Sequence, residues 1–148
     1  MLNKFCQYNN WANSLFLNTL TDNSALVPES SILLFSHIVN AQTRWISRIN
    51  GAIPSFGVWQ LHELETCRVL LEESANSLLQ LEQMKNIDTR VIKYSTTTGV
   101  NFETSVADIL LHTFNHGTYH RAQIAKELKQ HSIQPPSTDY VQFVRLHP

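Results

Sequence analysis

Apolar residues recur every three or four positions in four long segments of the chain, which is the spacing of one buried helix face. The first segment runs from about Leu2 to Leu20, and the second from Pro28 to the Asn50-Gly51 pair, a typical helix end. The third runs from about Val58 to Lys85, and the fourth from a cap at Thr104 or Ser105 to about Gln130. We therefore expect four long helices joined by short loops.

Two shorter elements complete the predicted fold. The residues VIKYSTTTGVNFE contain two β-branched or aromatic runs around a Thr-rich turn that ends in Gly99, which predicts a β-hairpin. After two prolines, Ser137 or Thr138 is expected to start a last short helix through Arg145. Because short loops favour antiparallel neighbours, the expected fold is all-α: an antiparallel four-helix bundle with a hairpin before the last long helix and a short C-terminal helix. We expect a single domain of residues 1–148.

Length and composition are those of a soluble globular protein. The 148 residues can bury a core without disulfides or structural metals, and 43% of them are hydrophobic while 16% are charged. No apolar stretch reaches membrane-spanning length, and the N-terminal residues lack the apolar core and cleavage pattern of a signal peptide. We therefore expect a cytoplasmic protein that does not act at a membrane.

Charge and cysteine usage exclude two further classes of protein. The formal net charge is −1 and the 11 Lys and Arg residues are scattered, so we expect no nucleic-acid partner. Cys6 and Cys67 are too few and too far apart for a disulfide framework or a thiolate zinc site. Cys67 is instead expected to be a small buried apolar residue. Any metal ion must then be held by nitrogen and oxygen.

Three histidines lie four positions apart in the segment HTFNHGTYHRAQIA of the predicted fourth helix. With about 100° per residue and Val106 set at zero, His120 lies at about −40°, His116 at about −80° and His112 at about −120°. The core direction is slightly positive of zero on this wheel. His120 is therefore at the edge of the apolar face, whereas His112 is turned furthest towards water.

Adjacent histidines of this series can share one metal ion. Residues one turn apart are separated by about 6 Å along the axis, and each imidazole nitrogen binds an ion at about 2 Å. His116 and His120 form the more inward pair, and His37 is the only other histidine embedded in a strongly apolar setting. Three such ligands would leave one coordination position for water or substrate. Histidines that only form hydrogen bonds fit the same pattern, so the spacing alone leaves both interpretations open.

The stretch NHGTYHRAQIAKEL resembles the signature of the DinB-like family (DinB and YfiT types), in which Asn-His is followed by His-Arg-Gly-Gln. SHIVNAQTRWISRI and PPSTDYVQFVR resemble that family's second helix and C-terminal segment. The resemblance implies a bundle, commonly a homodimer, that holds a divalent metal ion through His37, His116 and His120. Arg121 occupies the family's arginine position, where we expect a structural ion pair, and Ala122 replaces the usual glycine, which could narrow an approach between helices or subunits.

Related families include enzymes that add low-molecular-weight thiols to electrophiles or isomerise substrates with a thiol cofactor. A divalent ion, zinc or nickel by its nitrogen ligands, lowers the pKa of a bound thiol or water. The expected function is therefore a metal-dependent thiol S-transferase acting on a small molecule. The alternatives are a metal-dependent hydrolase and a non-catalytic, metal-stabilised interaction protein. No catalytic residue is assigned, and the low-molecular-weight thiol is implied by the resemblance alone.

Overall fold

The computed structural model describes residues 2–53, 55–83, 86–87, 89–96 and 98–148. Within them the chain forms five helices and a two-stranded antiparallel sheet, so the predicted, mainly helical class is confirmed. The elements in chain order are α1 (Leu2–Asp22), α2 (Glu29–Ile49), α3 (Leu64–Glu82), β1 (Val91–Ser95), β2 (Asn101–Ser105), α4 (Val106–Gln130) and α5 (Tyr140–Leu146).

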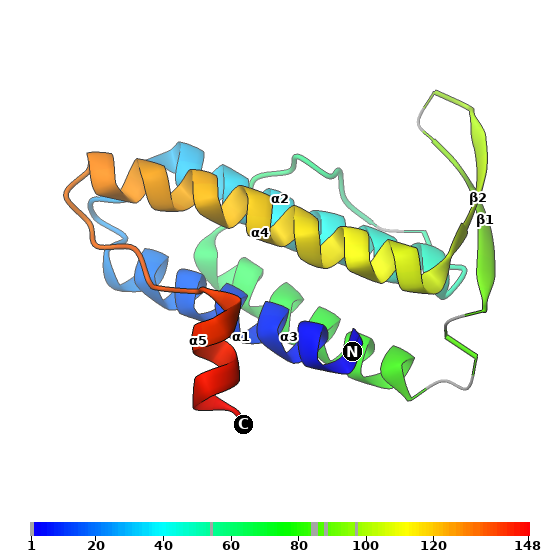
Figure 1. The fold of residues 1–148 in the computed structure, drawn as a ribbon. Helices are drawn as coiled ribbons and strands as arrows, with labels where there is room; N and C mark the ends of the chain where they lie inside the picture. Colours follow the sequence, from blue (N-terminus) through cyan, green and yellow to red (C-terminus); the bar gives the residue numbers. More distant parts are fainter. Residues whose placement is uncertain (1, 54, 84–85, 88, 97) are drawn as a thin grey trace.

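The four long helices lie in two layers. Figure 1 shows α2 and α4 side by side in one layer and α1 and α3 in the other. Helix α2 packs on α3 and α4, and α1 also packs on α3 and α4, so each long helix contacts two neighbours. The hairpin projects at one end of these helices, and α5 packs on the outer side of α1.

Two apolar clusters fill the interior at opposite ends of the helices. One takes Phe16 from α1 and Phe35 from α2, and the other takes Ile46 from α2 and Phe114 from α4. Each cluster draws buried side chains from all four long helices. The helical periodicity of the sequence therefore does mark the core.

A buried polar chain of four side chains separates the two clusters. Arg121 Nη1 of α4 donates to Asn9 Oδ1 of α1 at 3.3 Å, and Asn9 Nδ2 donates to Gln42 Oε1 of α2 at 2.8 Å. Gln42 Nε2 in turn donates to Ser74 Oγ of α3 at 2.7 Å. All four residues are less than 5% exposed. Each long helix thus contributes one member to this chain, and every link satisfies polar atoms that would otherwise be buried at a cost.

The predicted hairpin and the start of α4 are confirmed. Strand β1 pairs with β2 from Val91↔Ser105 to Ser95↔Asn101, and the turn contains Gly99 at a φ of +82°, a conformation that favours glycine. Ser105 then caps α4, because its hydroxyl oxygen accepts a hydrogen bond from the Asp108 backbone N–H at 3.0 Å. The strand therefore passes into the helix without a loop.

The predicted start of the third helix is wrong. Helix α3 begins at Leu64 and not near Val58, because side chains of α2 bind the backbone of the preceding segment. Asn40 Nδ2 donates to the carbonyl oxygen of Gln60 at 2.8 Å, and the His62 backbone N–H donates to Ser36 Oγ at 3.1 Å. These groups are not available for a helical ladder. The expected end at Lys85 lies outside the described residues.

The last short helix also starts later than predicted. Helix α5 begins at Tyr140, whereas Ser137 or Thr138 was expected to start it. The Tyr8 hydroxyl of α1 donates to the Thr138 carbonyl oxygen at 2.8 Å, which holds this segment extended along α1 and α4. Among the described residues, none of the helices has the length and apolar character needed to cross a membrane.

Candidate metal centre

Three histidines converge between α2 and α4. His37 comes from α2, and His116 and His120 come from successive turns of α4. One ring nitrogen from each lies within 4.8 Å of the others, and the Nε2 atoms of His37 and His116 are 3.0 Å apart. This group could hold a metal ion. This group consists of the three histidines that were proposed as metal ligands from the sequence.

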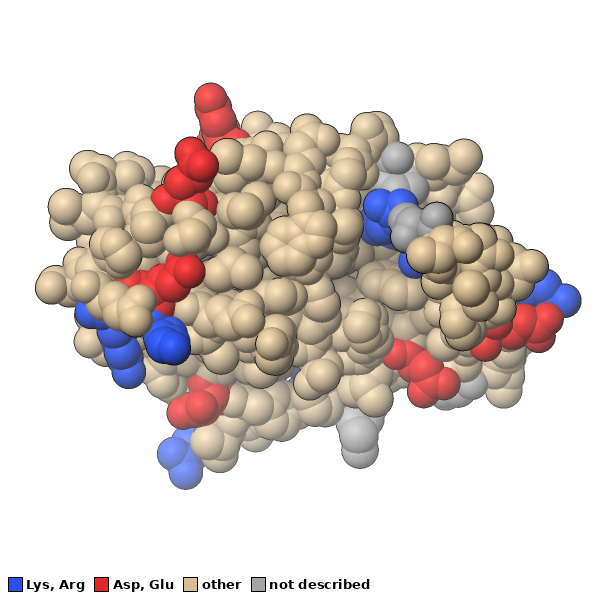
Figure 2. Space-filling view, turned by 90° about the horizontal axis from the view of Figure 1, so that it is seen from above, with Lys and Arg blue, Asp and Glu red and all other residues tan. Residues whose placement is uncertain are grey.

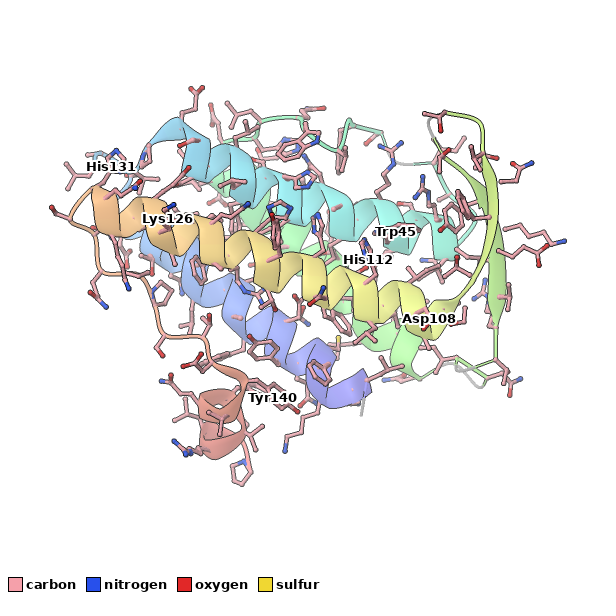
Figure 3. The ribbon with its side chains drawn as sticks, turned by 45° about the horizontal axis from the view of Figure 1, so that its top comes forward. Trp45, Asp108, His112, Lys126, His131 and Tyr140 are labelled. Carbon is pink, nitrogen blue, oxygen red and sulfur yellow. The ribbon has the colours of Figure 1, made fainter. Side chains whose placement is uncertain are left out.

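The order of burial along α4 is the one that the helical wheel predicts. His120 is buried, His116 is half-buried and His112 is exposed. The ring of His112 contacts that of Trp45 with centroids 5.6 Å apart, and Figure 3 shows the two residues on neighbouring helices α4 and α2. His112 lies beside the group, 5.8 Å from His116 between ring centroids, and is not a member of it.

Hydrogen bonds orient two of the three rings. His37 Nδ1 lies 2.9 Å from the carbonyl oxygen of Val58, which can only accept, so this nitrogen carries the proton. His120 Nδ1 lies 2.7 Å from Gln123 Oε1, which likewise accepts. In both rings the lone pair is then on Nε2. A partner on the second nitrogen that fixes the tautomer is the usual arrangement around a metal-binding histidine.

Sequence reasoning did not identify these partners. Three polar residues near the histidines in sequence, Glu103, Asp108 and Asn115, have other contacts or face solvent. The structure shows Asp108 in the helix cap, Glu103 in an ion pair with Lys93, and Asn115 exposed. Gln123 could have been found, because a residue three positions after His120 lies on the same side of the helix.

Burial favours the neutral form of His37 and His116. It lowers the pKa of His116 to about 4, with smaller contributions from the positive charges that His120, His37 and His112 would carry. Burial also lowers the pKa of His37, although the hydrogen bond to the Val58 carbonyl partly opposes this effect. A metal ion binds only the deprotonated ring. The site therefore offers lone pairs at neutral pH.

The distances fit a metal ion. Tetrahedral zinc with nitrogen ligands at 2.0–2.1 Å places those nitrogens about 3.4 Å from one another. The separations of 3.0 Å and up to 4.8 Å span that value, so small side-chain rotations bring the three nitrogens onto one ion. Three imidazole nitrogen donors suit zinc and the neighbouring first-row metals.

A loop residue covers His37. The indole of Trp59 lies parallel to the His37 ring with centroids 3.6 Å apart, yet Trp59 is 53% exposed. Tyr119 of α4 is 62% exposed and meets the His120 ring edge-on, with ring centroids 5.1 Å apart. Two accessible aromatic rings thus flank the histidines. Because Val58 and Trp59 were expected in a helix, the position of Trp59 over His37 was not predicted from the sequence.

Two other sequence expectations have different outcomes. Cys67 is fully buried against Ser36, and burial raises the pKa of its thiol, so it behaves as the predicted small apolar residue. The prediction that Arg121 forms a structural ion pair is wrong. No ion pair of Arg121 occurs among the described residues, and its guanidinium donates instead to Asn9, Asn13 and Thr118. The sequence could not identify these partners, because α1 supplies two of them.

The face above the histidines is weakly charged. Figure 2, which views the molecule from the side of α2 and α4, shows Lys, Arg, Asp and Glu side chains mainly towards the two ends of this face. Positive and negative groups lie close together at those ends. This face therefore has no continuous basic patch.

Comparison with known proteins identifies the family of this chain. The chain is 27% identical over 156 aligned positions to the protein DinB of Bacillus subtilis (strain 168), an alignment that covers 93% of this chain and 90% of that protein. The model of the DinB family matches residues 1–147. On this match, which spans nearly the whole chain and includes all three clustered histidines, the protein belongs to the DinB family.

Proposed function

We propose that His37, His116 and His120 bind one divalent metal ion and that the protein is a metal-dependent enzyme. The observation that carries this proposal is the convergence of three histidines, two of them oriented by hydrogen bonds to their second nitrogens. With three protein ligands, a tetrahedral ion keeps one position for water or substrate. That is the arrangement of catalytic sites.

The residues of the chain have separate tasks in this proposal. When bound, the ion lowers the pKa of a thiol or water so that a nucleophile forms at neutral pH. Val58 and Gln123 hold the rings of His37 and His120 in place. Trp59 shields one side of His37 from water and, like Tyr119, presents an aromatic face to an incoming molecule.

Our leading reaction is the transfer of a low-molecular-weight thiol to an electrophilic small molecule, with hydrolysis as the alternative. An assay with a thiol and an aryl halide, and a second assay with an activated ester and no thiol, separate the two. Activity that requires both the metal and the thiol supports transfer, whereas activity without a thiol supports hydrolysis. Zinc and nickel are the ions to test first.

Metal content tests the site itself. We expect about one ion per chain, as one three-ligand site holds, in the natural protein and in His112→Ala. The variants His37→Ala, His116→Ala and His120→Ala should lose it. His112→Ala is the matched control, because it removes a fourth histidine from the same helix. A natural protein that stays empty after incubation with zinc or nickel would contradict the proposal.

A non-catalytic, metal-stabilised interaction protein is the alternative from another class. Helices of this length with two apolar clusters should keep their fold when a chelator removes the ion, as an enzyme's would. Unfolding on metal removal, followed by circular dichroism, would favour the structural role.

We further propose that the four long helices form one antiparallel bundle in a single domain, which the two-layer packing supports. A homodimer in the cytoplasm without a nucleic-acid partner remains our expectation. Light scattering tests the dimer, and titration with duplex DNA at low salt, where phosphate attraction is strongest, tests the last point.

A further inference from the structure

Arg121 is a buried cation, and no carboxylate pairs with it in the part of the chain that the structure describes. Its side chain is 2% exposed, and its hydrogen-bond partners among the described residues are all neutral. Nη1 donates to Asn13 Oδ1 at 2.6 Å and to Asn9 Oδ1 at 3.3 Å, and Nη2 donates to Thr118 Oγ1 at 3.0 Å. The Tyr8 ring lies 5.6 Å from the guanidinium carbon. Because buried charges are normally paired, the missing anion calls for an explanation.

The guanidinium keeps its charge in this setting. Burial lowers the pKa of Arg121, and the hydroxyl of Tyr8 opposes this effect through its partial negative charge and a hydrogen bond. Arginine nevertheless stays protonated in proteins. The fold therefore maintains a positive charge at a place where the described residues supply dipoles and no counter-ion.

This charge lines a pocket between α1, α4 and residues 134–140. The pocket has a volume of about 560 Å³, within the range of about 300–1,000 Å³ usual for small-molecule sites. Hydroxyl groups of Tyr8, Thr118 and Thr138 belong to its wall. Its remaining wall is mixed: polar residues such as Lys129 and Gln134 line it together with the apolar Phe16, Ala122, Ala125, Pro135 and Pro136.

The surroundings of the pocket are positive on balance. Lys129 lines it together with Arg121, and Asp139 is the one carboxylate among its described lining residues. An adjoining groove is lined by Lys126 and Lys129 and shares Ala122 with the pocket. This distribution of charge favours the approach of an anion.

We propose that this pocket binds a small organic carboxylate, whose charge faces Arg121 and whose apolar part lies on Phe16 and the two prolines. The planar guanidinium suits a carboxylate, and the hydroxyl of Thr138 can donate to one of its oxygens. An apolar body matches the part of the wall that Phe16, Pro135 and Pro136 form. The ligand completes the pairing of a charge that the protein buries without a counter-ion.

The pocket is separate from the three histidines. His120 and Arg121 are neighbours in α4, but His120 lies against His37 of α2 whereas Arg121 lies against Asn9 and Asn13 of α1. The proposal therefore does not depend on a metal ion. It stands or falls independently of the proposed enzymatic function.

Titration with benzoate, followed by backbone amide NMR on the full chain at constant ionic strength, tests the proposal. We expect saturable shifts in residues 118–129 and 134–140. Benzyl alcohol, which has the same ring without the charge, should bind far more weakly. Shifts centred on residues around His37, or no saturable shifts, would overturn the proposal.

Two variants and a control assign the effect. Arg121→Gln should weaken benzoate binding about tenfold or more, because a charge-assisted interaction is lost. Ala122→Leu narrows the pocket from an exposed helix position and keeps every charge, so it remains informative if Arg121→Gln does not fold. Arg145→Gln makes the same change at an exposed position outside the pocket and should bind normally. Unchanged binding in Ala122→Leu, or in a folded Arg121→Gln, would contradict the assignment.

Discussion

Gly117 lies in the middle of α4, where alanine would ordinarily be preferred. Replacing a glycine inside a helix by alanine stabilises a protein by about 1 kcal/mol through helix propensity. At this position, however, an added Cβ would lie 2.9 Å from Arg121 Nη1 and 3.0 Å from Asn9 Oδ1. We predict that Gly117→Ala destabilises the fold, because this contact opposes and outweighs the gain in propensity.

The magnitude follows from the hydrogen bonds of Arg121. Its guanidinium cannot withdraw from the new methyl group without lengthening the bonds to Asn9, Asn13 or Thr118, because all three partners hold it in place. Losing one hydrogen bond to a charged group costs about 1.5–3 kcal/mol, so the net loss should be about 0.5–2 kcal/mol. For a chain of this size, such a loss lowers the Tm by about 2–6 °C.

Urea denaturation of the chelator-treated protein, followed by circular dichroism, measures this difference. Ala122→Gly is the control, because it makes the reverse change at an exposed position of the same helix and should cost about 1 kcal/mol. In an Arg121→Met background, Gly117→Ala should become less harmful or stabilising, since the main obstacle is gone. If Gly117→Ala stabilises the natural protein by the full gain in helix propensity, Arg121 and Asn9 can move away from the added methyl group at no cost, and our reasoning is refuted.

Three further predictions concern the histidines. The metal-free protein should lose stability as the pH falls from 6.5 towards 4. Burial lowers the pKa of His116 to about 4, so over this range the residue is neutral in the folded protein and protonated in the unfolded one. A plot of Tm against pH should therefore be flatter for His116→Gln than for the natural protein. Gln123→Leu should weaken metal binding about 10–100-fold in a competition with a chelator, whereas the exposed Gln130→Leu should not. Nickel should quench indole fluorescence in the natural protein and in Trp11→Phe but much less in Trp59→Phe. The reason is that Trp59, unlike Trp11, stacks on the candidate metal ligand His37. Equal quenching in all three proteins would contradict the stacked geometry.

Local patterns were enough to predict much of this structure. The order of burial of His120, His116 and His112 follows from the rotation of about 100° per residue, which does not depend on the rest of the fold. The cap at Ser105 and the turn at Gly99 are likewise decided within a few residues. These features can be predicted from sequence because the forces that set them act between near neighbours in the chain.

Contacts between distant segments decided what the sequence did not show. The segment after Val58 is apolar enough for a helix, but Asn40 and His37 of α2 bind its carbonyl groups and keep it irregular. The neutral partners of Arg121 come from α1, which is more than a hundred residues away in the chain. The periodicity of apolar residues along one helix does not indicate which side chains of another helix it will contact. They depend on which helix faces come together.

The buried polar chain restricts how the helices can be paired. Apolar stripes of similar character could pack against one another in several alignments, because hydrophobic contact is not directional. A helix that slid by one turn would move about 5.4 Å and leave Arg121, Asn9, Gln42 or Ser74 without its partner. Each misalignment would then bury an unsatisfied polar group at about 1–3 kcal/mol or more. The polar chain thus sets the longitudinal alignment of the helices, and with it the height at which His37 meets His116 and His120.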